Sequence, residues 1–113
     1  MPGAKDILTP EQIDLELHGL TQWTYVQGGL VTVYKLENAR QALDLISAVG
    51  DIAEEANHHP DLDWRYNRVL IRFSSHDAGG QVTTRDVSAA ATVSVGAERL
   101  GAVAGPDKYP AGS

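Results

Sequence analysis

The chain has 113 residues, which suits one domain with a modest hydrophobic core. Nine basic and fifteen acidic residues give a net charge of −6, and an acidic surface argues against direct binding to nucleic acid. The absence of cysteine excludes disulfides, thiolate nucleophiles and cysteine-ligated zinc. No apolar run could span a bilayer and MPGAKDILTP lacks a signal-peptide core, so we expect a soluble cytoplasmic protein without a membrane partner.

The N-terminal part predicts a short helix and then a β-hairpin. In TPEQIDLELHGL, Thr9 can cap a helix that begins with proline, and Gln12 three residues on completes a capping box. The β-prone runs 23–26 and 30–35 then lie on either side of a Gly-Gly turn.

The middle of the chain predicts the longest helix. Asn38 can cap it, and apolar residues follow the helical period over residues 39–56. Pro60 cannot continue a helix and biases the residue before it away from helical geometry. The two adjacent histidines, His58 and His59, are therefore expected at or just past the helix C-terminus.

The C-terminal part predicts a second strand pair, around Asn67, and a third helix. The T-x-x-D motif of Thr83 and Asp86 can open that helix, which is alanine-rich as far as Leu100. Its small residues, Ala90 and Ala97 among them, permit close approach of another helix and make it a candidate interface.

The predicted order of elements is α-β-β-α-β-β-α, and all of the connections are short. We therefore expect an α+β fold in one domain: a four-stranded antiparallel sheet with the helices packed on one face. We place this domain at residues 1–101 and expect residues 102–113 to form a disordered tail.

Three histidines are candidates for proton transfer, because imidazole titrates near neutral pH. His58 and His59 are adjacent, so their side chains diverge and cannot easily bind one metal together. His76 begins a glycine loop at a strand end, where catalytic groups often lie. Glu54 precedes His58 by four residues and can reach it on a helix. That pair is equally an ordinary helix contact, and a metal site of His58, His76 and Glu54 is a weaker alternative.

The run EEANHHPDLDWRYNRVLIRFSSHD, with TTRD after it, resembles the pterin-4a-carbinolamine dehydratase (4a-hydroxytetrahydrobiopterin dehydratase) family. The family signature is a carboxylate, a His-His-Pro triplet, an aromatic residue, a second histidine after Ser or Thr, a glycine loop and an aspartate. The likeness extends from about Leu8 to Gly101. The residues that match the signature are Glu54, His58, His59, Pro60, Tyr66, Ser75, His76, Gly80 and Asp86.

The resemblance implies a hydro-lyase that removes water from a 4a-hydroxytetrahydropterin and gives a quinonoid dihydropterin, as part of tetrahydrobiopterin recycling. It implies a homodimer or homotetramer, a pterin as the small-molecule substrate, and neither a metal nor a bound cofactor. The implied catalytic residues are His58, His59 and His76. The implied substrate-binding residues are Glu54, Asn57, Ser75, Asp86 and Trp23.

Two departures from the family pattern leave an alternative open. The loop HDAGGQVTTRD from His76 to Asp86 is one residue longer than the usual form. Tyr34, Leu36 and Leu43 stand where phenylalanines are expected. The alternative is a diverged member that acts as a dehydratase or cyclase on another substrate, or a non-catalytic dimerisation or assembly cofactor.

Overall fold

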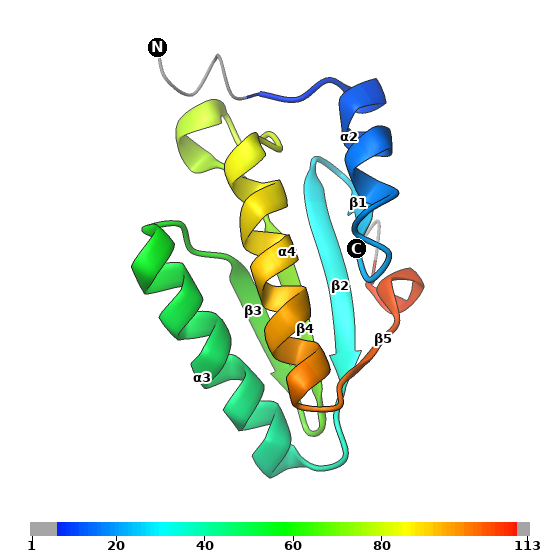
Figure 1. Ribbon diagram of the computed structural model, residues 1–113, viewed down its shortest axis with the longest axis vertical. Coiled ribbons are helices and arrows are strands. Elements are labelled where there is room, and N and C mark those ends of the chain that lie inside the picture. Colours follow the sequence, from blue (N-terminus) through cyan, green and yellow to red (C-terminus); the bar gives the residue numbers. More distant parts are fainter. Residues whose placement is uncertain (1–6, 111–113) are drawn as a thin grey trace.

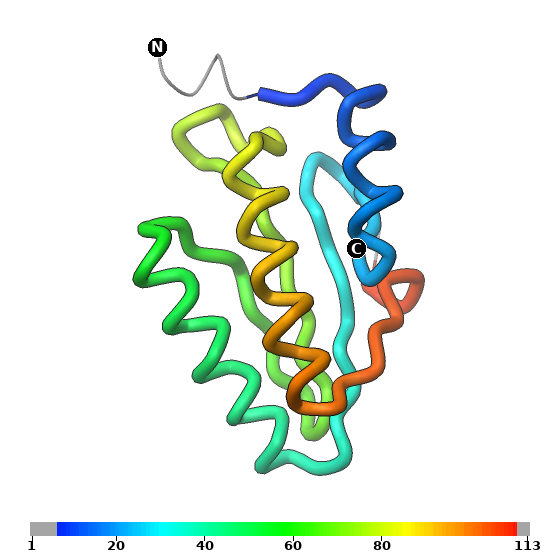
Figure 2. Tube along the Cα trace, viewed as in Figure 1, coloured from blue at the N-terminus to red at the C-terminus, as the bar shows by residue number. Residues whose placement is uncertain are grey.

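A computed structural model, which describes residues 7–110, has the predicted α+β architecture. Helices α3 and α4 cross one face of an antiparallel sheet, and α2 lies beside β1 (Figures 1 and 2). The elements are α2 (Pro10–Leu17), β1 (Thr24–Val26), β2 (Gly29–Lys35), α3 (Ala39–Ala56), β3 (Asp61–Arg65), β4 (Arg68–Phe73), the 3₁₀ turn η1 (His76–Ala78), α4 (Thr84–Arg99), β5 (Val103–Ala104) and the 3₁₀ turn η2 (Pro106–Lys108).

The strands follow the order β1-β2-β4-β3, and every pairing is antiparallel. Cross-strand partners share a face, and the pairs Leu30↔Phe73 and Tyr34↔Val69 point toward the helices. These four side chains are fully buried in the main core. The alternation of residues along β4 thus decides which of its side chains reach the helices.

The helix starts match the capping signals in the sequence. Thr9 with Gln12 forms a complete capping box on α2, and Thr83 with Asp86 forms another on α4. The Asn38 side chain accepts a hydrogen bond from the Gln41 amide at the start of α3. All three predicted caps are confirmed.

Helix α3 ends at Asn57, which adopts the left-handed conformation with φ 51° and ψ 43°. The amide of Asn57 donates to Glu54 O and that of His58 donates to Ala53 O, which together form a Schellman motif. Asparagine is one of the few residues besides glycine that take this conformation readily. The turn redirects the chain, so that His58 points inward instead of continuing the helix.

The segment after residue 101 differs from the expectation of a disordered tail. Val103 and Ala104 form β5, a fifth strand that pairs with the end of β2, and the Gly105 amide donates to Val33 O at 2.7 Å. β1 pairs with only the first residues of β2, and β5 supplies hydrogen-bond partners to the backbone groups farther along the same edge. Residues 111–113 lie outside the described part of the chain, and the domain boundary at residue 101 remains a prediction.

The face of the sheet opposite the helices is organised around Arg72. Its guanidinium donates to Val26 O at 2.9 Å and to Gln27 O at 2.6 Å, across the hairpin that joins β1 to β2. Gly29 lies directly beneath it: a Cβ at this position would stand 2.6 Å from Arg72 Cζ. Only glycine leaves room for this contact.

Gly29→Ala should therefore lower the free energy of unfolding by about 1–3 kcal/mol. The added methyl group forces the Arg72 guanidinium away and breaks its two bonds to the hairpin carbonyls. Urea denaturation measures the change.

Gly50→Ala is the matched control, because Gly50 lies within α3 and a Cβ there meets nothing within 4 Å. This change should raise the free energy of unfolding by about 0.5–1 kcal/mol, since alanine favours a helix over glycine. Equal effects of the two substitutions would contradict the role given to the Arg72 contact.

Candidate functional site

His58 is held between α3, β4 and α4, and its side chain is only 10% exposed. Its ring stacks on Phe73 with centroids 5.9 Å apart and planes 15° from parallel. Its Nε2 atom lies 2.6 Å from Asp86 Oδ1. One face and one nitrogen of the imidazole are thus fixed by the protein.

Asp86 is fully buried at the start of α4, and each of its carboxylate oxygens has a partner. Oδ1 faces His58. Oδ2 accepts from the Thr83 amide at 2.8 Å and from the Ser75 hydroxyl at 2.9 Å. A buried carboxylate needs such partners, because an unpaired charge in the interior costs several kcal/mol. The capping residue of α4 is therefore also the partner of His58.

The contact with Asp86 decides where the proton of neutral His58 resides. A carboxylate without a proton can only accept hydrogen bonds, so the Nε2 atom that faces it carries the hydrogen. The other ring nitrogen, Nδ1, is then the one that can accept a proton from a bound molecule.

The predicted contact between Glu54 and His58 is wrong. Glu54 Oε2 instead lies 2.5 Å from His59 Nε2, and both side chains are more than half exposed. The left-handed turn at Asn57 is the cause, because it brings the residue five positions after Glu54 over the last turn of α3. His58 forms its hydrogen bond with Asp86 instead, a contact that the helical spacing did not indicate.

The three candidate histidines line one hollow of about 340 Å³ beside the end of β4. His76, the first residue of η1, is exposed at this hollow. The lining residues are Asn57, His58, His59, Ser74, His76, Asp77 and Arg85. The structure thus brings together imidazoles that are up to 18 positions apart in the sequence.

The loop between His76 and Asp86 folds so that the aspartate reaches His58. Gly79 and Gly80 take positive φ values of 70° and 79°, which allow the chain to double back. Ser75 then pairs with Gln81 in an isolated antiparallel bridge. Asp86, at the end of this loop, lies within hydrogen-bond distance of His58.

An ion pair that the sequence reasoning missed lies along the wall of the hollow. Both terminal nitrogens of Arg85 donate to the carboxylate of Asp77, each at 2.9 Å. The hydrogen bond from Arg85 holds the pKa of Asp77 below its ordinary value. Asp77 follows His76 and Arg85 precedes Asp86, and these neighbours were the only signal in the sequence. Nothing in the spacing of Asp77 and Arg85 indicates that they pair across the loop.

Of the five predicted substrate-binding residues, Asn57 lines the hollow, whereas Glu54, Ser75, Asp86 and Trp23 do not. Trp23 is buried in the core against Tyr34 and Phe73, and its Nε1 donates to Ser94 Oγ at 2.8 Å. Ser75 is fully buried, with its hydroxyl on Asp86. Both residues sit behind the site as supports, because their polar groups already have partners in the interior.

The metal alternative is not supported by the arrangement of its three proposed ligands. Glu54 is paired with His59 and so does not join His58 and His76. Within residues 7–110, no group of three or more His, Cys, Asp or Glu side chains could hold a metal ion.

Comparison with known proteins gives one consistent family. The family model described as pterin 4 alpha carbinolamine dehydratase matches residues 6–95. A protein of Herpetosiphon aurantiacus named "Putative pterin-4-alpha-carbinolamine dehydratase" is 37% identical over 87 residues, which cover 77% of this chain and 90% of that protein. A protein of the same name from Thermomicrobium roseum is 40% identical over 74 residues, covering 66% of this chain and 78% of its own.

A solved structure has a similar fold. The crystal structure described as "transcriptional coactivator/pterin dehydratase from Brucella Melitensis" matches with a TM-score of 0.75 at 24% identity, covering 80% of this chain and 97% of that one. At this level of identity the likeness supports the fold.

Asp86→Asn should switch the tautomer of neutral His58 from Nε2–H to Nδ1–H. The Thr83 amide and Ser75 hydroxyl both donate to one oxygen of residue 86, so an asparagine keeps its carbonyl there. Its NH₂ group then faces His58 Nε2, which must become an acceptor. The ¹⁵N shifts of the imidazole, measured where the ring is neutral, distinguish the tautomers.

Asp77→Asn serves as the control, because Asp77 lines the same hollow but its carboxylate pairs with Arg85. His58 should keep the Nε2–H form in that variant. An Nε2–H tautomer for His58 in Asp86→Asn would contradict the proposed hydrogen-bond arrangement.

Proposed function

The chain belongs to the pterin-4a-carbinolamine dehydratase family, and from that premise we propose that it removes water from a 4a-hydroxytetrahydropterin to give a quinonoid dihydropterin. The observation that carries this proposal is the hollow lined by three histidines, one of them buried against a carboxylate. The reaction would return an oxidised pterin to the recycling of its cofactor form. A cytoplasmic location remains a prediction; among residues 7–110, no helix is long and apolar enough to cross a membrane.

The reaction needs both an acid and a base. Hydroxide is a poor leaving group, so an acid must protonate the 4a-oxygen as the carbon–oxygen bond breaks. A base must remove the N5 proton so that the ring can become quinonoid. Positioned imidazoles can do both near neutral pH, and each such proton transfer is typically worth roughly 10²–10⁴-fold in rate.

We assign the proton transfers to His58 and His76. His58 is the better positioned of the two, because Asp86 and Phe73 hold its ring. His76 lies on η1, a different element, and so can approach a flat ring from another side. The exposed pair of His59 and Glu54 is suited to hold the pterin.

The remaining predicted residues act in this proposal by positioning or supporting other residues of the site. Asn57 lines the hollow and also sets the turn that aims His58. Asp86 and Ser75 are positioning residues, because they act on the substrate only through His58. Trp23 supports Phe73 from behind, at a centroid distance of 5.7 Å.

His58→Gln and His76→Gln should each reduce the dehydration rate by roughly 10²–10⁴-fold, because each removes one of the two proton-transfer groups. The assay follows the loss of chemically prepared 4a-hydroxytetrahydropterin. His18→Gln is the matched control: His18 is exposed at the end of α2, away from the hollow, and its rate should equal that of the unmodified chain.

The alternative function is a diverged or non-catalytic member that uses the scaffold for assembly. An unmodified chain that does not accelerate the dehydration would favour that alternative and contradict the proposal. Full activity in both His58→Gln and His76→Gln would contradict the assignment of the proton transfers to these two histidines.

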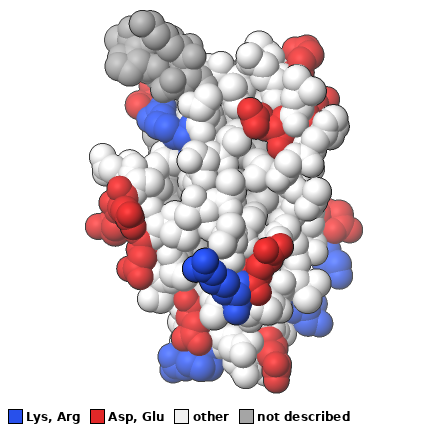
Figure 3. All heavy atoms as spheres, viewed as in Figure 1, with Lys and Arg blue, Asp and Glu red and all other residues white. Residues whose placement is uncertain are grey.

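We further propose that the chain forms homo-oligomers through α3 and α4. On this face of the molecule an area above the centre is free of charged side chains, and basic and acidic side chains lie side by side just below it (Figure 3). A trough between the two helices is lined by Ala48, Asp51, Ile52, Ala91, Thr92, Val95, Gly96 and Arg99. The sequence suggests Ala90 and Ala97 for such an interface, but both are fully buried in the core of their own chain.

Val95→Arg should weaken self-association, because Val95 is 50% exposed on the trough and a buried unpaired charge is costly. Light scattering after size exclusion measures the mass against the 12.1 kDa chain. Leu15→Arg, on α2 and 68% exposed, is the control and should keep the native mass. A monomeric unmodified chain would contradict the proposal.

A further inference from the structure

Basic side chains gather at the end of the sheet that lies farthest from the histidines. Lys35 on β2 pairs directly with Arg68 on β4, and Arg68 pairs in turn with Arg65 on β3. Cross-strand partners share a face, so these cations form a row on the face opposite the helices. The row uses three of the nine basic residues of a chain whose net charge is −6.

This row is unfavourable by itself, because like charges directly opposite each other in a sheet repel. Arg65 is neutralised by Asp63, with an N–O distance of 2.8 Å. Lys35 and Arg68 differ from it: within residues 7–110, neither has an ion pair to an acidic side chain. Among residues 7–110, the two adjacent cations thus have no carboxylate that pairs with them.

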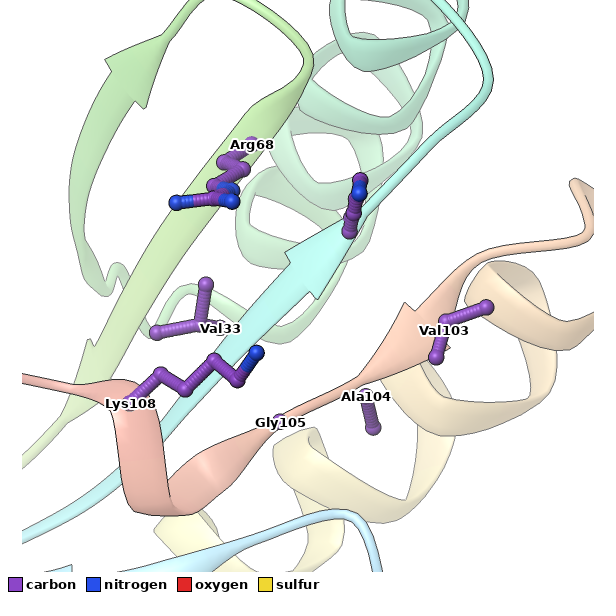
Figure 4. A pocket seen from close by; sticks show the side chains of 7 residues that line it. Val33, Arg68, Val103, Ala104, Gly105 and Lys108 are labelled. Carbon is purple, nitrogen blue, oxygen red and sulfur yellow. The ribbon is translucent and has the colours of Figure 1, made fainter.

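The C-terminal segment adds a third cation to the same place. The β5 pairing and the Gly105 bond to Val33 O hold this segment along β2, and η2 then carries Lys108 over the sheet. The three cations and four small or apolar residues line one hollow of about 80 Å³: Val33, Lys35, Arg68, Val103, Ala104, Gly105 and Lys108. In Figure 4 the Lys108 side chain reaches toward Val33, with Arg68 on the other side of that valine.

We propose that this hollow binds the phosphate group of a small phosphomonoester, with the organic part of the ligand resting on Val103. The hollow of about 80 Å³ is several times the roughly 10–15 Å³ that one water molecule needs in this measure, so it has room for a small oxyanion. Three cations without a lining carboxylate match a phosphate monoester, whose charge is about −1.5 to −2 at neutral pH. Arg68 can offer a two-pronged contact, and the lysines act as point charges.

The site is separate from the histidine hollow. Arg68 is the first residue of β4, whereas Ser74, which lines the histidine hollow, follows the last. The cations also lie on the face of the sheet away from the helices. The ligand would therefore stabilise the tail and the sheet end, and would not take part in the proton transfers.

The apolar neighbour makes a phosphomonoester a better fit than inorganic phosphate. Val103 is 67% exposed at the mouth of the hollow and offers a surface for a hydrocarbon group. Phenyl phosphate, inorganic phosphate and benzoate therefore test the two halves of the proposal separately. The first carries both features, and each of the others lacks one.

The test is an NMR titration of the ¹⁵N-labelled full chain with these three probes at constant ionic strength. Phenyl phosphate should saturate at one equivalent, shift the amides of Val33, Ala104 and Gly105, and bind more tightly than either other probe. Each of Lys35→Gln, Arg68→Gln and Lys108→Gln should weaken it by about tenfold, the loss typical of one charged hydrogen bond. The control Arg40→Gln, at the exposed start of α3, should bind as the unmodified chain does.

Several results would overturn the proposal. One is an absence of saturable shifts at these amides at millimolar phenyl phosphate. Another is an equal loss of phenyl phosphate affinity in Arg40→Gln and in the three test variants, which would indicate nonspecific attraction of the anion to positive charge. If benzoate binds as tightly as phenyl phosphate, the hollow does not select a phosphate group. If inorganic phosphate binds as tightly as phenyl phosphate, Val103 does not contribute to binding. Amide spectra that retain the native dispersion establish that each variant is folded.

Discussion

The structure depends on one buried carboxylate, that of Asp86. It caps α4 through the Thr83 amide, fastens the end of β4 through the Ser75 hydroxyl, and holds His58 at the end of α3. Removing one partner of such a buried pair typically costs 3–5 kcal/mol. The ends of α3 and β4 and the start of α4 therefore meet at a single buried charge, and His58, which this charge holds, lines the candidate site.

The same arrangement fixes one histidine of the site and leaves the other two more exposed. The imidazole of His58 has one face on Phe73 and one nitrogen on Asp86, so its remaining nitrogen has a defined position. His59 and His76 lie on more exposed chain and can adapt to a ligand. A fixed group beside adaptable ones suits proton transfer to a flat ring, since catalysis depends on geometry before it depends on pKa.

The sequence predicted what local chemistry decides. Thr9, Asn38 and Thr83 cap the helices as their side chains indicate, and the spacing of apolar residues predicted the helices and the sheet. It did not predict that His58 pairs with Asp86 instead of Glu54, because a left-handed turn at Asn57 redirects the chain. It also missed β5, since pairing with a free strand edge is decided by the rest of the fold.

The central claim is that Asp86 acts on the reaction through His58. A double-mutant cycle on the dehydration rate tests it most directly, with Asp86→Asn, His58→Gln and the combined variant, each checked for a folded spectrum. If the claim holds, the double variant is no slower than His58→Gln alone, because the carboxylate has no other route to the substrate. Rate losses that multiply in the double variant would show that Asp86 acts independently, and would contradict the account.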